Sequence, residues 1–122
     1  MLKEGRVIFM RNFVFFVSLR SNVPFVLKEA LRMVENGHKV SVFFDLDGAR
    51  VLDKNYVKVR KRNHNVDLDI LLQNAVDKGI KLFGCQMNVL IADGLELIDG
   101  AELAGVVTFL EKAYEADAVL SY

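Results

Sequence analysis

The sequence is poor in the residues on which several classes of small protein depend. Its single cysteine, Cys85, cannot form an internal disulfide, and Cys85, His38 and His64 share no spacing typical of a metal site. A GxGxxG segment, a Walker loop and a CxxC pair are also missing. These absences exclude Rossmann-type dinucleotide binding, Walker-type nucleotide hydrolysis and dithiol chemistry. We therefore expect no metal and no cofactor.

An excess of charge and a long hydrophobic run are missing too. The 16 basic and 16 acidic residues cancel, so nothing draws the protein toward nucleic acid or an anionic membrane. Residues 6–19 are apolar, but Arg11 and Asn12 divide them into pieces far shorter than the roughly 20 residues that span a bilayer. Without a disulfide or a secretion signal, the sequence predicts a cytoplasmic protein with no membrane partner.

What the sequence does contain is enough apolar material for one core. The 122 residues, of which 52% are hydrophobic, predict a single domain over residues 1–122. Residues 1–11 are interpreted as a variable or disordered leader, and Met10 is an alternative start, because the first predicted strand is complete without them.

Strand and helix patterns alternate along the chain. Runs of β-branched and aromatic residues predict strands over residues 12–18, 39–44, 80–84 and 117–122, and helical stripes lie between them. Residues 45–48 form a turn in this interpretation, and the pattern of residues 49–65 is ambiguous. The alternation predicts a three-layer α/β/α sandwich on a mostly parallel sheet, with flavodoxin-like topology.

The last predicted helix begins near Asp99-Gly100 and presents one apolar face. Leu103, Val107, Leu110 and Tyr114 lie on that face at helical spacing.

Basic residues gather in residues 54–62, where no acidic residue follows Asp53. We interpret this stretch as a solvated basic loop. The alternative is a loop that holds an anion or phosphate, although no glycine-rich cradle accompanies the charges.

Polar side chains follow the predicted strands. In a parallel sheet, ligands bind beyond the carboxyl ends of the strands, so Ser18, Asn22, Asp45, Asp47 and Cys85 are candidate neighbours. A small-ligand site formed by Ser18, Asn22 and Asp45 is one hypothesis. Asp45 and Asp47 alternate on an extended segment, which argues against a paired-carboxylate site.

Cys85 follows a buried strand and precedes a short predicted helix over residues 86–93. A thiol near the positive end of a helix dipole would be reactive. The alternative is a small buried hydrophobic residue at a strand end.

The C-terminal half of the chain resembles the DsrE/DsrF/DsrH-like proteins, in particular the stand-alone members sometimes labelled peroxiredoxin-like. The resemblance is carried by residues 84–88, 93–95, 97–111 and 116–120, and it extends more loosely over residues 12–122. It implies a small sulfur-relay fold in which Cys85 accepts sulfane sulfur as a persulfide and passes it to a partner protein. Asn88 departs from the small hydroxyl residue often found three places after that cysteine, and we include Asn88 among the candidate ligand-binding residues. A peroxidatic cysteine works with a nearby threonine and arginine, and the only threonine, Thr108, lies in the last predicted helix, so nothing in the sequence supports peroxidase chemistry.

The resemblance also implies homotrimers or hexamers and protein partners that donate or accept sulfur. The first functional hypothesis is therefore a sulfur carrier, whose enzymatic activity would be at most sulfurtransferase-like. The second is a non-catalytic oligomeric binding or assembly module in which Cys85 is structural. Apolar helix residues left over from the core, such as Val106, Phe109 and Ile91, would then form the subunit contacts.

Overall fold

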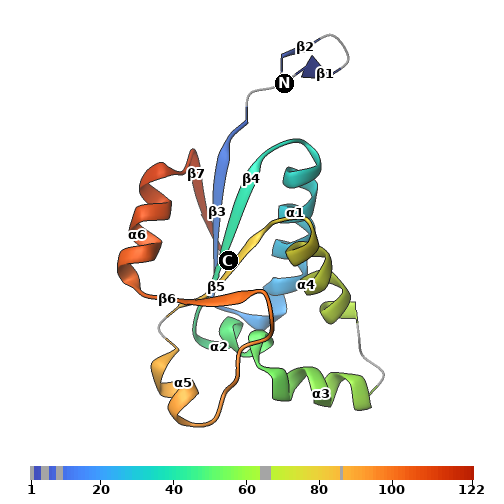
Figure 1. Cartoon of the computed structure of the whole chain (residues 1–122), viewed down its shortest axis with the longest axis vertical. Helices are drawn as coiled ribbons and strands as arrows, with labels where there is room; N and C mark the ends of the chain where they lie inside the picture. The colour runs from blue at the N-terminus through green and yellow to red at the C-terminus, as the bar shows by residue number, and fades with distance from the viewer. Residues whose placement is uncertain (1, 4–5, 8–9, 64–66, 86) are drawn as a thin grey trace.

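The computed structural model of the chain describes residues 2–3, 6–7, 10–63, 67–85 and 87–122. Five parallel strands form its central sheet, in the order β6-β5-β4-β3-β7 (Figure 1). Their bounds are β3 Asn12–Val17, β4 Lys39–Phe44, β5 Lys81–Cys85, β6 Ala101–Ala104 and β7 Ala118–Ser121. The two-residue strands β1 (Leu2–Lys3) and β2 (Arg6–Val7) pair with each other in a separate antiparallel ladder.

Helices cover both faces of the sheet, so the three-layer α/β architecture is confirmed. In Figure 1, α1 and α4 lie on one side of the strands and α6 lies on the other. The helices are α1 Val23–Glu35, α2 Leu46–Ala49, α3 Lys54–Arg62, α4 Asp67–Asp77, α5 Asn88–Ala92 and α6 Val106–Glu115, with 3₁₀ turns at η1 Arg20–Asn22 and η2 Arg50–Leu52.

The strand order corrects the flavodoxin-like part of the prediction. A flavodoxin-like sheet has the order 2-1-3-4-5, whereas here β4, β5 and β6 are added one after another on the same side of β3. The chain then returns through α6 and places β7 on the other side of β3. Short apolar strands carry no signal for their neighbours in a sheet, which is why sequence patterns did not give this order.

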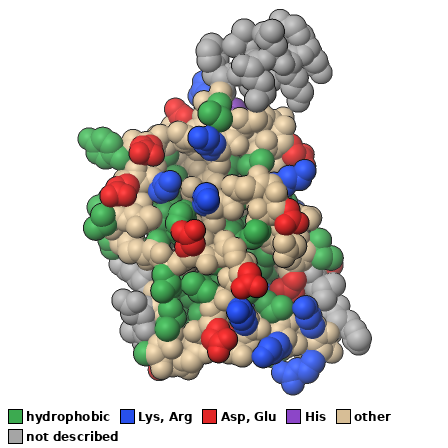
Figure 2. Space-filling model, viewed as in Figure 1, with side chains coloured by type: hydrophobic (Ala, Val, Ile, Leu, Met, Phe, Trp, Pro, Cys, Tyr) green, Lys and Arg blue, Asp and Glu red, His purple; other side chains and the backbone are tan. Residues whose placement is uncertain are grey.

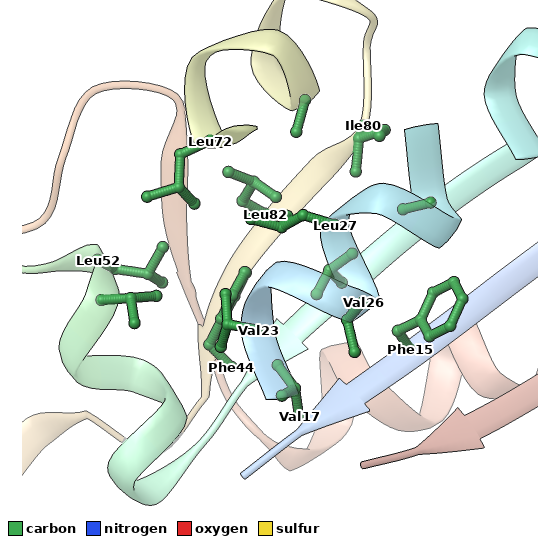
Figure 3. Close-up of a cluster of buried hydrophobic side chains, with 14 of the residues drawn as sticks. Phe15, Val17, Val23, Val26, Leu27, Phe44, Leu52, Leu72, Ile80 and Leu82 are labelled. Carbon is green, nitrogen blue, oxygen red and sulfur yellow. The ribbon is translucent and has the colours of Figure 1, made fainter. Parts of the chain in front are cut away.

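Side chains of the three central strands, β3, β4 and β5, alternate between two separate clusters of buried residues. Phe15 and Val17 of β3, with Phe44 of β4 and Leu82 of β5, belong to the large cluster under α1 and α4 (Figure 3). Neighbouring residues in the same strands point the other way and form a small cluster whose buried members are Val14, Phe43, Phe83 and Cys85. We call these the α1–α4 cluster and the α6 cluster.

Local sequence explains the boundaries of α1. Pro24 lies in its first turn, where the missing N–H costs no hydrogen bond, and Gly37 follows the helix with a φ of 89° that an L-residue rarely adopts. Its buried residues, Val23, Val26, Leu27 and Ala30, face the sheet.

The last helix differs most from the prediction. Residues 101–104 form strand β6, and α6 begins only at Val106. The predicted helix face is therefore wrong in part, because Leu103 lies in β6. All four residues of that face, Leu103, Val107, Leu110 and Tyr114, are exposed. The Ala-Glu-Leu-Ala segment lacks the β-branched and aromatic residues that signal a strand.

Two smaller interpretations are also corrected. Residues 54–62 form helix α3 rather than a loop, and Asp53 caps it by accepting a hydrogen bond from the Asn55 backbone N–H (3.0 Å). Residues 46–49 form the single helical turn α2, which agrees with the turn predicted over residues 45–48 but not with an extended segment through Asp47.

Candidate functional site

The carboxyl ends of β3, β4 and β5 meet at one edge of the sheet, as parallel strands require. Ser18 follows β3, Asp45 follows β4, and Cys85 is the last residue of β5. The backbone N–H of Asp45 donates to the Val17 carbonyl (3.0 Å), and that of Ser18 donates to the Tyr122 carbonyl (2.9 Å). Because Val17 pairs with Phe44 and accepts the hydrogen bond from Asp45, the next residues of the two segments, Ser18 and Asp45, lie side by side.

The turn after Asp45 packs tightly against the end of β3. The Gly48 backbone N–H donates to the Ser18 carbonyl (2.9 Å). A Cβ atom on Gly48 would lie 2.6 Å from the Val17 carbonyl oxygen, so a side chain here would displace backbone. Glycine at this position brings α2 into contact with the candidate edge.

An arginine that sequence patterns did not single out links the surrounding loops. Arg20 pairs with Asp47 (Nε to Oδ1, 2.8 Å), and its backbone N–H donates to Asp47 Oδ2 (3.0 Å). Arg20 also donates to the Tyr56 hydroxyl of α3 and lies over the Tyr56 ring, 5.2 Å from its centre. Asp47 is thus held in an ion pair with Arg20. The two residues are 27 positions apart, and nothing in the sequence besides their opposite charges indicates that they pair.

Asn22 and Asn88 lie at helix starts. Asn22 ends η1 directly before α1, where its half-buried side chain makes no capping hydrogen bond, and η1 packs beside α2. Asn88 begins α5, but its side chain lies outside the described part of the structure.

Cys85 is buried, with 4% of its surface exposed. Its neighbours in the α6 cluster are aromatic and aliphatic: Phe43 and Phe83 stack with ring centres 4.7 Å apart, and Phe109 of α6 packs edge-on against Phe43. The sulfur therefore lies in an apolar environment on the side of the sheet that α6 covers.

Burial raises the pKa of the Cys85 thiol, and the negative charge of Asp45 raises it further. Both effects disfavour the thiolate. Of the two interpretations of Cys85, the structure agrees with a buried residue at a strand end. The lowering of its pKa that a helix dipole would cause is not what the surroundings produce. The following helix, α5, has only five residues.

Among the predicted site residues, Asp45 is the one whose charge acts on Cys85, adding to the rise in the pKa of the thiol that burial causes. Ser18 is adjacent to Asp45 through the backbone, and Asn22 lies on the neighbouring η1 turn. Within the described residues, no three histidine, cysteine, aspartate or glutamate side chains lie close enough to hold a metal ion. No helix among these residues is both long and apolar enough to cross a bilayer.

Comparison with known proteins agrees with this fold. A crystal structure of the ychN protein from E. coli superposes with a TM-score of 0.76 at 19% sequence identity, covering 93% of this chain and 100% of that one. No curated protein matches the chain. Residues 22–120 match the family described as DsrE/DsrF/DrsH-like. Since that match spans most of the sequence, the chain belongs to the DsrE/DsrF/DsrH-like family.

Proposed function

We propose that this protein is a cytoplasmic sulfur carrier in which Cys85 accepts sulfane sulfur as a persulfide and passes it to a partner protein. Membership of a family associated with sulfur relay supports the proposal at the level of the family. The observation that supports a role for one residue is the position of Cys85 at the carboxyl end of a central strand. The Asp45 carboxylate is close enough to raise the pKa of its thiol.

The transfer step needs a proton acceptor, because the thiol is held in its protonated form. In the proposed step Asp45 takes the proton, and the Cys85 thiolate attacks the outer sulfur of a donor persulfide, R–S–SH. A new S–S bond forms on Cys85 while the donor S–S bond breaks. The donor sulfur leaves with the electron pair and takes up the proton from Asp45, so Cys85 is oxidised to the persulfide and the donor is reduced to a thiol.

Burial gives this carrier a closed resting state. A protonated thiol among Phe43, Phe83 and Phe109 reacts slowly with small oxidants, because the thiolate is the nucleophile. A partner protein would have to open the edge of the sheet to reach it. Leu46, directly after Asp45, supplies an apolar contact for such a partner: its side chain is 68% exposed and its φ is +49°.

The direct test is to incubate the reduced protein with a persulfide donor and measure its intact mass. We expect one addition of about 32 Da on the wild type and none on Cys85→Ala. An unmodified wild type, or the same addition on Cys85→Ala, would overturn the proposal.

The variant Asp45→Asn distinguishes two roles of Asp45: accepting the thiol proton during transfer, and raising the Cys85 pKa by its charge alone. Removing the carboxylate lowers the Cys85 pKa, so alkylation by iodoacetamide at pH 8 should become faster. If Asp45 accepts the proton, sulfur transfer should become slower in the same variant. Asp93→Asn, in the exposed turn after α5, should change neither rate. Asp45→Asn that accelerates both reactions would refute the role of Asp45.

A second candidate function is an oligomeric assembly module, a trimer or hexamer in which Cys85 is structural. It is favoured by the outer face of α6, which exposes Val106, Val107, Leu110 and Tyr114. Figure 2 shows hydrophobic side chains at the left edge, where Figure 1 shows α6. Tyr114 is 95% exposed. Large apolar side chains that are exposed together on one face commonly mark a contact surface. Of the expected contact residues, Val106 and Ile91 are exposed, but Phe109 packs against Phe16 and Phe43 and belongs to the core.

Sedimentation velocity at micromolar concentration tests this candidate. We expect a discrete oligomer for the wild type and a monomer for Leu110→Asp, with Glu111→Gln on the same helix as the matched control. A wild-type monomer, or an oligomer that Leu110→Asp leaves intact, would count against a contact through α6.

A further inference from the structure

A cavity of about 570 Å³ opens between α3 and α4, within the size range of small-ligand sites. None of its lining residues belongs to the α6 cluster around Cys85. The cavity is therefore separate from the candidate sulfur site, and the inference below does not depend on the proposed function.

The walls of this cavity are largely apolar. Val57 of α3, Ile70 and Val76 of α4, and Ile98 of the following loop all line it. Ile70 is 54% exposed, so its side chain contributes open apolar surface to the wall. A ligand with an apolar body would cover this surface.

Three lysines line the same cavity from one face of α3. Lys54, Lys58 and Lys61 have the spacing i, i+4, i+7, which places them in a row along the helix. Figure 2 shows the corresponding group of basic side chains at the lower right, where Figure 1 shows α3.

The acidic residues of the cavity do not neutralise this row. Asp69 is bound by Arg60, whose Nε lies 3.1 Å from both carboxylate oxygens, and Arg60 also donates to the Val51 carbonyl. Asp99 pairs loosely with Lys54 at 3.7 Å and is fully exposed. Among the described residues, Lys58 and Lys61 take part in no ion pair.

We propose that this cavity binds a small amphipathic anion, with its apolar body against Val57, Ile70 and Ile98 and its anionic head at Lys58 and Lys61. The charge row selects the sign of the head group, and the apolar walls select a ligand with a hydrocarbon part over inorganic phosphate. This assigns a role to the basic stretch that sequence patterns singled out.

The test compares ligands that share an eight-carbon chain and differ in the head group: octanoate, 1-octanol and octylammonium. Each is titrated into the ¹⁵N-labelled protein below its micelle concentration, with inorganic phosphate as the head-group control. We expect octanoate to shift the amides of α3, α4 and Ile98, and to bind about three- to tenfold more tightly than 1-octanol, because two partly exposed ion pairs contribute modestly. Octylammonium and phosphate should bind more weakly still.

Matched charge reversals test the residues. The double variant Lys58→Glu/Lys61→Glu should lose the preference for octanoate, whereas Lys28→Glu on the exposed face of α1 should keep it. Ile70→Gln should weaken octanoate and 1-octanol alike, because it changes the apolar wall only. Circular dichroism of each variant establishes that it is folded.

Lysine stems can also cover apolar surface without binding anything. In that case octanoate and 1-octanol would bind equally, or the shifted amides would lie away from α3 and α4. Either result, or an equal loss of octanoate binding in Lys28→Glu, would overturn the proposal.

Discussion

The two faces of the sheet are built very differently. Among the described residues, the α1–α4 cluster contains 18 buried side chains, whereas the α6 cluster contains 4. Two long helices cover the first face and a single helix covers the second (Figure 1). The face that supplies most of the apolar burial is thus distinct from the face on which Cys85 lies.

This difference suggests a division of labour within one small domain. Apolar burial is the main favourable term in folding, so stability rests chiefly on the α1–α4 cluster. The thinner α6 side can carry a thiol, an exposed apolar helix face and contacts with partners at little cost to the fold. The predictions below test that division, beginning with the largest expected effect.

Phe43 and Phe44 allow a matched comparison, because they are adjacent in β4, fully buried and directed to opposite clusters. We expect Phe44→Ala to lower the free energy of unfolding by about 3–5 kcal/mol, as is usual for a buried aromatic residue. Phe43→Ala should cost at least about 1 kcal/mol less, since the small cluster can relax around the gap. Urea denaturation measures both values, and equal costs would refute the division.

The next largest effect on stability is expected from the glycines near the carboxyl ends of the strands. Gly48→Ala should lower the free energy of unfolding by about 2–3 kcal/mol, because its Cβ would press on the Val17 carbonyl oxygen. Gly84→Ala should cost less, since its Cβ would meet the flexible Met87 side chain instead of backbone. Thermal unfolding of the two variants checks the order, and a larger loss for Gly84→Ala would contradict it.

Periodic patterns predicted the frame of this fold well. The strand predicted over residues 39–44 agrees with β4 at both ends, and Pro24 and Gly37 lie at the two limits of α1. These elements are strongly apolar and bounded by residues with special backbone requirements. The four-residue strand β6 was missed because its composition also suits a helix, and this error extended the last predicted helix over residues that belong to the sheet.

The candidate site was predictable in outline only. The rule for parallel sheets correctly grouped Ser18, Asp45 and Cys85 at one edge. It did not reveal that Cys85 is buried among Phe43, Phe83 and Phe109, because these residues come from three separate segments. The link between Arg20 and Asp47, and the lysine-lined cavity, likewise depend on side chains that only the tertiary fold brings together.

A smaller, pH-dependent effect is expected from Cys85. Its pKa is raised by burial and by Asp45, so the folded state holds the thiol proton more strongly than the unfolded state, where the pKa of a cysteine is about 8.5. As pH rises above that value, the unfolded state releases its proton first, and stability must fall. Urea denaturation between pH 7 and 10 should therefore show a decline in the wild type that is reduced in Cys85→Ala. An identical pH dependence in the two proteins would contradict the raised pKa.

The smallest effect on monomer stability is expected on the outer face of α6. Leu110 is 56% exposed, so Leu110→Gln should change the free energy of unfolding by no more than about 0.5 kcal/mol when measured at a concentration too low for association. Phe109→Ala, one position earlier on the same helix, should cost several times more, because Phe109 packs against Phe16 and Phe43. At high concentration the comparison changes. If α6 joins subunits, the apparent stability of the wild type should rise with protein concentration, and Leu110→Gln should lose that rise. A large loss of stability in the dilute monomer would instead show that Leu110 packs in the core of its own chain. The outer face of α6 would then not be the exposed surface on which the proposed subunit contact depends.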